Sequence, residues 1–424
     1  MAQLYLFQNN LSGTIPTQLA SIPVLEFIWI NNNRLTGSIP NLGNLPLKKL
    51  WLQNNNLNGP IPSQFGNLIY IDNLLLYNNS LTGQIPSQLG NMKVINYLLL
   101  NNNFLTGPLP SELSNLTQLI CFNAESNRLS GQIPNNLDQL KRLRYLYLNS
   151  NSMTGSLPSA LSRMASLRYL YLQNNKLSGT IPVTIITNYL VAINLSSNKL
   201  QGNLQQLFNT SRLSSLQYLI MSNLLLSGSI PDVLFKSKID TIVLSGNCIT
   251  NTIPVSVCNA SSMTSLVLDG VSSNQLCSTF QSKTYFGGTI PECLFSLSSL
   301  ETLHLAGNAL SGTLPEMPLN SSLSILSLSN NRLIGTTPES ILTHGEFVFF
   351  DISSNKISGI VDGFVSYVNG EATVLNMTIN RLSGSPIYTN SSDVTLNILQ
   401  GNLFACPTPK NDIHHGKDFP FFFQ

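Results

Sequence analysis

The stretch LYLQNNKLSGTIP, from Leu170 to Pro182, contains the pattern that decides the fold. It consists of an apolar strand, an asparagine and then Leu-Ser/Thr-Gly-x-Ile-Pro. The pattern returns about every 24 residues, for example as LSGTIP at 11–16, LTGQIP at 81–86, LSGQIP at 129–134 and LSGSIP at 226–231. Aligning the copies gives about 17 turns of one repeated unit. Such a period predicts a solenoid of stacked turns.

The leucines of each turn are expected to form the core. In an extended strand successive side chains alternate between two faces, so Leu170 and Leu172 point to one side and Tyr171 and Gln173 to the other. No single turn can bury its own leucines. Stacked turns can, because each leucine meets its copies above and below.

An asparagine follows the strand in most turns, and we interpret it as a structural ladder. An amide carries both a donor and an acceptor, so it can satisfy backbone groups where the strand turns a corner. Left unpaired in the interior, the same amide would cost roughly 1 to 3 kcal/mol. The expected ladder comprises Asn33, Asn55, Asn79, Asn103, Asn127, Asn151, Asn175 and Asn198, with later members at Asn247, Asn308, Asn331, Asn355 and Asn380.

The Leu-x-Gly-x-Ile-Pro signature resembles the plant-type leucine-rich repeat, and the resemblance covers nearly the whole chain. It implies an α/β repeat fold: a right-handed solenoid, curved or superhelical like a horseshoe. A parallel β-sheet would line the concave face, and short helical or irregular segments the convex face. Repeats of this type build the outer domains of receptor-like kinases and receptor-like proteins, and also secreted inhibitors of cell-wall enzymes.

The period also sets the expected domain organisation. We expect one leucine-rich-repeat array over 1–406 with a short insertion near 272–288, where the spacing between equivalent positions is 37 residues. Residues 407–424 are interpreted as a tail that is disordered or truncated. The chain begins inside a strand, at Met1, so we expect a fragment or a gene model that lacks its 5′ end. With strands about 4.8 Å apart, 17 turns would give an inner edge of roughly 80 Å.

Composition argues against several classes of protein. Charged residues make up 9% of the chain and the net charge is +2, whereas nucleic-acid binding requires a basic stripe. No apolar run reaches the 18 residues of a membrane helix, and no leader-like segment precedes the repeats.

Asparagines in N-x-Ser/Thr sequons permit a glycosylated, extracellular protein; they are Asn10, Asn78, Asn115, Asn194, Asn209, Asn259, Asn320, Asn376 and Asn390.

Four of the six cysteines fall within 46 residues: Cys248, Cys258, Cys277 and Cys293. Disulfides, free buried thiols and a metal site are the three interpretations. Short CxxC or HxxxH pairs, which metal sites usually contain, are missing, so we expect no metal. If the four form disulfides, three pairings are open. Disulfides would indicate an oxidising, extracytoplasmic setting.

Aromatic side chains recur at the outward strand positions of the first ten turns. Rings of this kind, beside amides that donate and accept, would suit a sugar chain or an extended peptide. The alternative is that aromatic residues simply favour strands. The candidate ligand-binding residues are Phe27, Trp29, Trp51, Tyr77, Tyr97, Tyr145, Tyr147, Tyr169, Tyr171 and Tyr218, and the amides beside them include Asn31, Asn32, Gln53, Asn54, Asn78, Asn102, Asn149 and Gln173.

Catalysis is not expected. The histidines share no motif with a nucleophile, and the sequence contains no HExxH, P-loop, GxSxG or kinase signature. His414 and His415 could bind a metal, but a solvated pair in a tail is the preferred interpretation. We therefore predict no catalytic residue and no cofactor.

The leading hypothesis is a non-catalytic domain that binds an extended peptide, protein or glycan on its concave face. The resemblance implies the extracellular part of a cell-surface signalling receptor, with a co-receptor as a further partner and with membrane association only through segments outside this chain. One alternative is a secreted inhibitor or wall-associated binding protein. Another is an intracellular scaffold with free cysteines.

Overall fold

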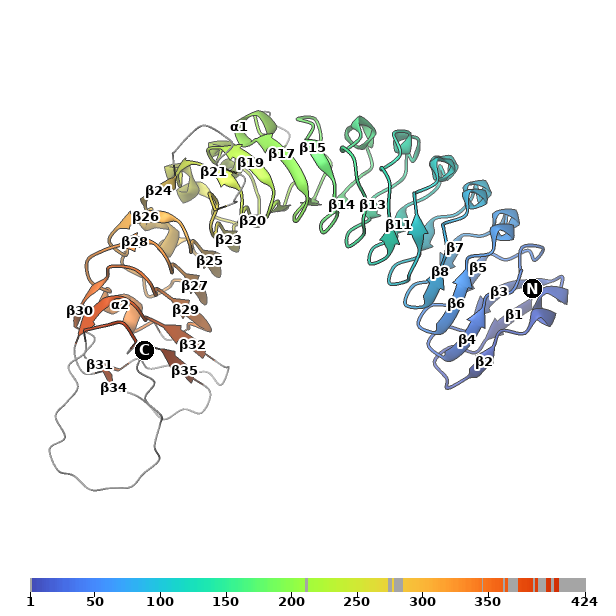
Figure 1. Cartoon of the computed structure of the whole chain (residues 1–424), viewed down its shortest axis with the longest axis horizontal. Coiled ribbons are helices and arrows are strands. Elements are labelled where there is room, and N and C mark those ends of the chain that lie inside the picture. Colours follow the sequence, from blue (N-terminus) through green and yellow to red (C-terminus); the bar gives the residue numbers. More distant parts are fainter. Residues whose placement is uncertain are drawn as a thin grey trace, which may run out of the picture.

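The chain forms a single arch of stacked turns (Figure 1). The computed structural model describes residues 2–209, 213–273, 277, 285–344, 346–360, 363–364, 373–383, 386–387, 394–397 and 400–403. The strand β1 lies at one foot of the arch and β35 at the other. The expected tail at 407–424, with His414 and His415, lies outside the described residues.

Each turn contributes one short strand to a 17-stranded sheet, in which strands that are neighbours along the array pair in parallel. The expected repeat fold with a parallel sheet is thus confirmed. The strands are β1 (Ala2–Tyr5), β3 (Leu25–Trp29), β5 (Lys49–Trp51), β7 (Asn73–Leu75), β9 (Tyr97–Leu99), β11 (Cys121–Asn123), β13 (Tyr145–Tyr147), β14 (Tyr169–Tyr171), β16 (Ala192–Asn194), β18 (Tyr218–Ile220), β20 (Thr241–Val243), β23 (Ser265–Val267), β25 (Thr302–His304), β27 (Ile325–Ser327), β29 (Phe349–Asp351), β32 (Thr373–Asn376) and β35 (Val394–Asn397).

A second strand follows the asparagine in most turns, and these strands form smaller parallel sheets. In most turns a glycine in or just after this strand adopts the left-handed region, as at Gly131 with φ +74°, where a side chain would press on Pro108 of the preceding turn. The strands are β2 (Ser12–Thr14), β4 (Arg34–Ser38), β6 (Asn56–Pro60), β8 (Ser80–Thr82), β10 (Thr106–Gly107), β12 (Arg128–Leu129), β15 (Ser178–Thr180), β17 (Lys199–Asn203), β19 (Leu225–Gly228), β21 (Cys248–Ile249), β22 (Asn251–Thr252), β24 (Phe286–Thr289), β26 (Ala309–Gly312), β28 (Arg332–Leu333), β30 (Ser358–Ile360), β31 (Gly363–Phe364), β33 (Arg381–Ser383) and β34 (Pro386–Ile387).

Short helices lie on the outer rim of the arch (Figure 1). Most are single 3₁₀ turns that begin directly after the proline of Ile-Pro, whose missing N–H and fixed φ suit the start of a helix. They are η1 (Thr17–Ser21), η2 (Ser63–Asn67), η3 (Ser87–Asn91), η4 (Ser111–Asn115), η5 (Leu137–Gln139), η6 (Ser159–Arg163), η7 (Asp232–Lys236), η8 (Val255–Asn259) and η10 (Glu292–Ser296), together with the α-helices α1 (Leu204–Leu207) and α2 (Glu339–Leu342). None of the helices in the described ranges has the length and apolar character that crossing a bilayer requires.

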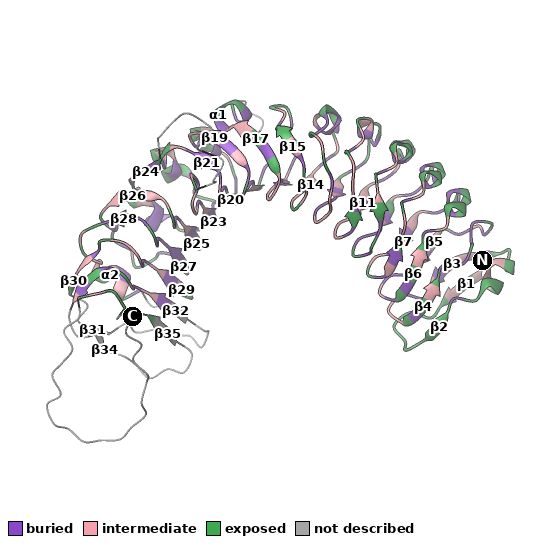
Figure 2. Ribbon diagram, in the orientation of Figure 1, coloured by how far each residue is buried: buried purple, intermediate pink, exposed green. Residues whose placement is uncertain are grey.

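The core is one continuous column of apolar side chains inside the turns. Leu146, Leu170 and their equivalents are almost inaccessible to solvent and belong to a single cluster that runs from Ile15 to Leu382. Figure 2 shows the buried residues within the turns and the exposed ones mainly on the outer rim. Because the core is shared between neighbours, each turn depends on the next for its burial.

The asparagines after the strands tie each turn to the one before it. The side-chain Nδ2 of Asn79 donates to the carbonyl oxygens of Leu76, at 3.1 Å, and of Leu52 in the preceding turn, at 3.0 Å. Its Oδ1 accepts from the backbone N–H of Leu57 at 3.0 Å. The same bonds recur at Asn33, Asn55, Asn103, Asn127, Asn151, Asn175 and Asn198.

Two disulfides hold the region of the insertion. Cys248 in β21 is bonded to Cys277, and Cys258 in η8 is bonded to Cys293 in η10. The second bond links the outer-rim helices of two successive turns. The regular array is present again at Phe286, where β24 pairs with β22 and β26.

Candidate inner binding surface

The outward side chains of the 17-stranded sheet form the inner surface of the arch, in three parallel rows. Row 1 contains Phe27, Lys49, Asn73, Tyr97, Cys121, Tyr145, Tyr169, Ala192 and Tyr218. Row 2 contains Tyr5, Trp29, Trp51, Leu75, Leu99, Asn123, Tyr147, Tyr171 and Asn194. Row 3, two residues further along each turn, contains Phe7, Asn31, Gln53, Tyr77, Asn101, Glu125, Asn149 and Gln173.

The first aromatic group on this surface, the tryptophan cluster, consists of Tyr5, Phe27, Trp29 and Trp51. The rings of Trp29 and Trp51 stack with centroids 4.3 Å apart and planes within 8°, and Tyr5 stacks on the other side of Trp29 at 4.4 Å. The Nζ of Lys49 lies 5.8 Å from the Trp51 ring. Neither indole Nε1 has a hydrogen-bond partner or solvent access. The ring faces are therefore largely covered by one another.

A second group, the tyrosine cluster, lies on β13 and β14 and consists of Tyr145, Tyr147, Tyr169 and Tyr171. Tyr145 and Tyr169 stack at 5.0 Å with planes within 11°, and Tyr147 and Tyr171 lie 5.0 Å apart with a 38° tilt. All four side chains are half-buried. In this cluster too, neighbouring rings cover part of one another's faces.

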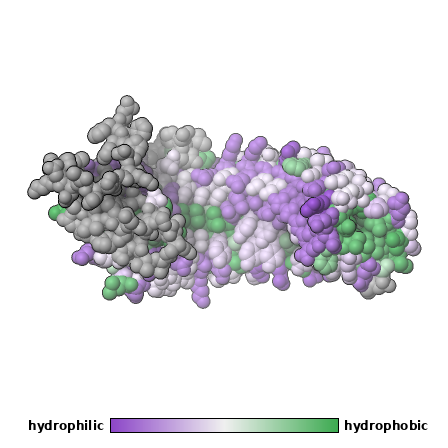
Figure 3. All heavy atoms as spheres, turned by 90° about the horizontal axis from the view of Figure 1, so that it is seen from below, coloured by the Kyte–Doolittle hydropathy of each residue, from purple (hydrophilic) through white to green (hydrophobic). Residues whose placement is uncertain are grey.

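The aromatic residues at the outward strand positions gather in two separate clusters on the inner surface. Leu75, Leu99 and Asn123 separate the two clusters in row 2. The other candidates make no stacking contact among the described residues: Tyr97 and Tyr218 lie apart in row 1, and Tyr77 lies in row 3. Seen from below, the N-terminal limb shows a hydrophobic area and the middle of the arch is paler and more hydrophilic (Figure 3). The inner surface thus offers two separate aromatic sites.

The amides beside the rings fall into two sets with different hydrogen bonding. In the first, Asn78 Nδ2 donates to Asn54 Oδ1 at 2.6 Å, and Asn102 Nδ2 donates to Asn78 Oδ1 at 2.7 Å, so these amides satisfy one another. The second set has side-chain oxygens that are buried without a partner. It comprises Asn31 and Gln53 beside the tryptophan cluster and Asn149 and Gln173 beside the tyrosine cluster. The oxygens of this second set are covered and have no hydrogen-bond partner in the described structure, so each would gain a bond if its side chain turned toward a donor.

Two phenols of the tyrosine cluster resist ionisation. Burial, with the neighbouring Cys121 and tyrosine side chains, raises the pKa of Tyr147 far above its ordinary 10, and burial is also the main cause that raises the pKa of Tyr171. Burial raises the pKa of the Cys121 thiol to about 12. At neutral pH these groups are uncharged, so the phenols act as hydrogen-bond donors.

We expect Tyr147 and Tyr171 to ionise last when the chain's 13 tyrosines are titrated by their absorbance. A tyrosine whose pKa is higher in the folded than in the unfolded protein stabilises the fold at pH values below the unfolded pKa of about 10. This stabilisation is lost as the pH rises through the folded pKa. Stability should therefore fall above about pH 10, and this fall should be smaller in Tyr147→Phe/Tyr171→Phe. The double variant should lack the highest-pH part of the absorbance change. If the double variant instead lost the part of the absorbance change at lower pH, the assignment of the raised pKa values to Tyr147 and Tyr171 would be wrong.

His304, the histidine of row 2 in β25, does not complete a catalytic arrangement. Its Nδ1 lies 3.3 Å from Asp269 Oδ2. Ser327 is its row neighbour on β27, yet no hydrogen bond joins the two side chains in the described structure. This part of the inner surface carries a histidine–carboxylate contact, and the described residues beside it include no nucleophile hydrogen-bonded to His304.

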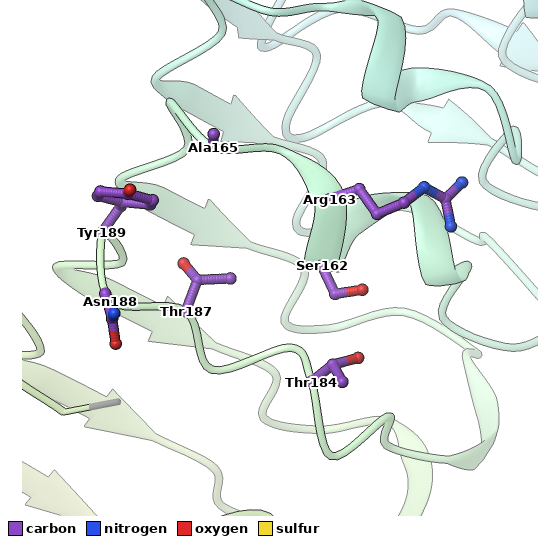
Figure 4. A pocket seen from close by; sticks show the side chains of 7 residues that line it. All are labelled: Ser162, Arg163, Ala165, Thr184, Thr187, Asn188 and Tyr189. Carbon is purple, nitrogen blue, oxygen red and sulfur yellow. The ribbon is translucent and has the colours of Figure 1, made fainter. Parts of the chain in front are cut away.

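A hollow of about 300 Å³ lies away from the inner surface, against η6 (Figure 4). It forms where the turn after Pro182 lacks a 3₁₀ helix, which leaves space between η6 and 184–189. The lining is mainly polar: Ser162, Arg163, Ala165, Thr184, Thr187, Asn188 and Tyr189. Figure 4 shows the Arg163 side chain directed away from Thr184 and Thr187. The hollow contains no convergent set of charged groups.

Comparison with known proteins agrees with this architecture. A leucine rich repeat family model matches residues 122–177, and a second Leucine Rich Repeat model matches 46–68, 71–92, 299–320 and 322–343. No curated protein matches the sequence at a significant level. The chain is a leucine-rich-repeat protein.

Among solved structures, it is similar to those of plant receptor-kinase ectodomains. The plant peptide hormone receptor RGFR1 in complex with RGF2 shares 28% identity with a TM-score of 0.78 over 93% of this chain. The Arabidopsis receptor kinase HAESA, in complex with the peptide hormone IDA and the co-receptor SERK1, shares 29% identity with a TM-score of 0.70 over 94%. The chain spans 65% of the RGFR1 structure and 73% of the HAESA structure. A Leptospira interrogans leucine-rich-repeat protein, LIC12759, shares 25% identity with a TM-score of 0.55, covering 78% of this chain and 85% of that one.

Proposed function

We propose that this chain is a non-catalytic recognition domain that captures an extended peptide on its inner surface. The observation that carries the proposal is the pair of aromatic clusters, each flanked by buried amide oxygens without partners. When these amide side chains turn toward a bound peptide, the peptide backbone brings N–H donors for their oxygens, and apolar side chains pack well against aromatic rings. A rigid sheet loses little conformational freedom on binding, which favours affinity.

The ring geometry favours a peptide over a glycan. Sugars bind aromatic residues through the open face of a ring, whereas Trp29 and Trp51 cover each other at 4.3 Å. Two structures similar to this chain are receptors in complex with peptide hormones. Peptide capture by the extracellular part of a cell-surface receptor is therefore the preferred function. The two disulfides support the extracellular location over an intracellular scaffold.

The test uses a phage library of random twelve-residue peptides, panned on the purified chain. The panning should recover peptides that bind the wild-type chain. Their affinity should fall at least about thirtyfold for the quadruple variant Trp29→Ala/Trp51→Ala/Tyr147→Ala/Tyr171→Ala, because losing one aromatic hot spot costs about 2 kcal/mol.

The matched control is Tyr70→Ala/Tyr285→Ala, which removes two exposed tyrosines outside the three rows. It should leave the affinity within about twofold, as expected for surface positions outside the interface. Circular dichroism should show that both variants remain folded. The proposal fails if no recovered peptide distinguishes the inner-surface variant from the control.

A further inference from the structure

Missing 3₁₀ helices leave hollows at two places on the array, away from the inner surface. The second turn has no such helix over 40–48, and a hollow of about 410 Å³ there has apolar lining residues that include Pro46, Ile69 and Tyr70. The turn after Pro182 also lacks one, and it carries the hollow of about 300 Å³ against η6. The two hollows share an origin but differ in the chemistry of their lining.

Hydroxyl and amide groups line the second of these, which we call the polar hollow. Figure 4 shows Ser162 and Thr184 on one side of it and Thr187, Asn188 and Tyr189 on the other. Hydroxyl and amide groups each donate and accept hydrogen bonds. The polar hollow therefore suits a ligand that presents donors and acceptors close together.

Arg163, which also borders the polar hollow, is engaged elsewhere. Its Nε forms an ion pair with Asp138 at 2.8 Å, and its Nη1 donates to Ser159 Oγ at 3.1 Å. Its side chain points away from the opposite wall (Figure 4). An anionic ligand would thus compete with Asp138 for this cation, so the arrangement favours a neutral ligand.

The polar groups of the hollow have hydrogen-bonding capacity to spare. The side chains of Thr184 and Asn188 are exposed, and Ser162 Oγ, which donates to the Ser159 carbonyl at 2.7 Å, keeps its lone pairs as acceptors. Thr187 Oγ1 is covered and has no hydrogen-bond partner. A rotation about the Cα–Cβ bond of Thr187 would bring this hydroxyl into the hollow without breaking a hydrogen bond.

The Tyr189 ring adds an apolar surface to the same hollow. The residue is 49% exposed, and the Arg168 guanidinium lies over its ring, 5.1 Å from the centroid. This guanidinium also donates to the carbonyls of Ala165 and Leu167 at 3.3 Å each, so it supports the ring from one side. Unlike the rings of the tryptophan cluster, Tyr189 is not stacked on another ring in the described part of the chain. The ring face opposite Arg168 is left for a ligand.

We propose that the polar hollow binds a neutral saccharide, with the C–H face of one sugar ring on Tyr189 and sugar hydroxyls on Thr184, Thr187 and Asn188. A sugar ring combines an apolar face with closely spaced hydroxyls that donate and accept, as this lining requires. The volume lies at the lower end of the range for small-molecule sites, about 300 to 1,000 Å³, which limits the bound part to roughly one or two sugar units. The site is separate from the inner surface and does not depend on peptide capture there.

The test titrates the purified chain with neutral trisaccharides and follows saturation-transfer NMR signals of the sugars. The probes are cellotriose, xylotriose and mannotriose, with trigalacturonic acid as the charged counterpart. At least one neutral trimer should bind, and it should bind more tightly than the acid. A preference for cellotriose or xylotriose indicates a polysaccharide as the source of the ligand, and a preference for mannotriose indicates a protein-linked glycan.

Two variants test the assigned contacts. Tyr189→Ala should weaken binding of the preferred trimer at least about fivefold, because it removes the aromatic surface. Thr187→Val keeps the shape of the side chain and removes the hydroxyl, so it should also weaken binding about fivefold. The melting temperature of Thr187→Val should not fall, because Oγ1 has no hydrogen bond to lose.

The matched control is Tyr70→Ala, which removes a 57% exposed tyrosine from the other hollow. It should change the affinity less than about twofold, as should the quadruple variant of the inner surface, because both lie outside the site. The proposal is wrong if no neutral trimer binds, if trigalacturonic acid binds more tightly, or if Tyr70→Ala or the inner-surface variant weakens binding as much as Tyr189→Ala. Each of these results would leave the test of peptide capture unaffected.

Discussion

Replacing Asn79 with alanine is expected to destabilise the array by about 1 to 3 kcal/mol, because it leaves the buried N–H of Leu57 without an acceptor and removes one of two asparagine donors at each of two buried carbonyls. The carbonyl of Leu52 keeps its bond from Asn55, and the carbonyl of Leu76 keeps its bond from Asn103. The side chain bonds the carbonyls of Leu52 and Leu76 and the N–H of Leu57. Leu52, Leu57 and Leu76 are each fully buried, so water cannot replace the lost bonds. Chemical denaturation would measure the loss.

The loss of stability in Asn79→Ala should be confined to the turns next to the substitution. In a repeat protein, stability is approximately a sum of single-turn terms and interface terms, so a broken bond between two turns should act locally. Hydrogen exchange should therefore accelerate first at the amide of Leu57, which loses its acceptor. The control is Asn56→Ala, since Asn56 is the exposed neighbour in β6. If the two variants unfold at the same denaturant concentration, the ladder does not contribute as we argue.

The fold could be predicted from the sequence because its decisive features are periodic. Leucines at alternating strand positions and asparagines at strand ends require no knowledge of distant contacts, and Leu146 and Leu170 lie in adjacent strands, as the period indicates. The sheet and the outer-rim helices follow from these positions.

The organisation of the site could not be predicted in the same way. Whether Trp29 and Trp51 turn their faces to each other or to solvent depends on side-chain packing, which the period does not encode. Among the amides, Asn54 and Gln53 look alike in sequence, yet Asn54 is bonded to its neighbours and Gln53 has a buried oxygen without a partner. The sequence also does not show which basic residues form ion pairs, because Asp138 and its partner Arg163 are 25 residues apart.

The disulfide pairing shows the same limit. Four cysteines allow three pairings, and a choice requires the positions of the extra residues that interrupt the period. In the structure, Cys258 and Cys293 have Cα atoms 5.4 Å apart on the outer rim, although 35 residues separate them in sequence. The insertion brings them to equivalent places in successive turns, a spacing that the 24-residue period alone would not produce.

The bond between Cys258 and Cys293 should therefore stabilise the weakest junction of the array. In the unfolded chain it closes a loop of 35 residues, which corresponds to about 3 to 4 kcal/mol of loop-closure entropy. At this junction the equivalent positions Val271 and Asn308 are 37 residues apart, whereas an ordinary turn has about 24, so the connection between β23 and β25 is the longer one. Cys258→Ala/Cys293→Ala should thus lower stability at this junction more than elsewhere.

The expected result is a change in the form of thermal unfolding as well as in its midpoint. Once the junction is weakened, the turns on its two sides should unfold separately, because nearest-neighbour coupling is what makes a repeat array cooperative. Calorimetry of the double variant should resolve two transitions, with the one that includes β24 to β29 at the lower temperature. Cys121→Ser is the control, since Cys121 is the free cysteine among the described residues and lies far from the junction. A double variant that melts in one transition at the wild-type temperature would show that packing between η8 and η10 holds the junction without the bond.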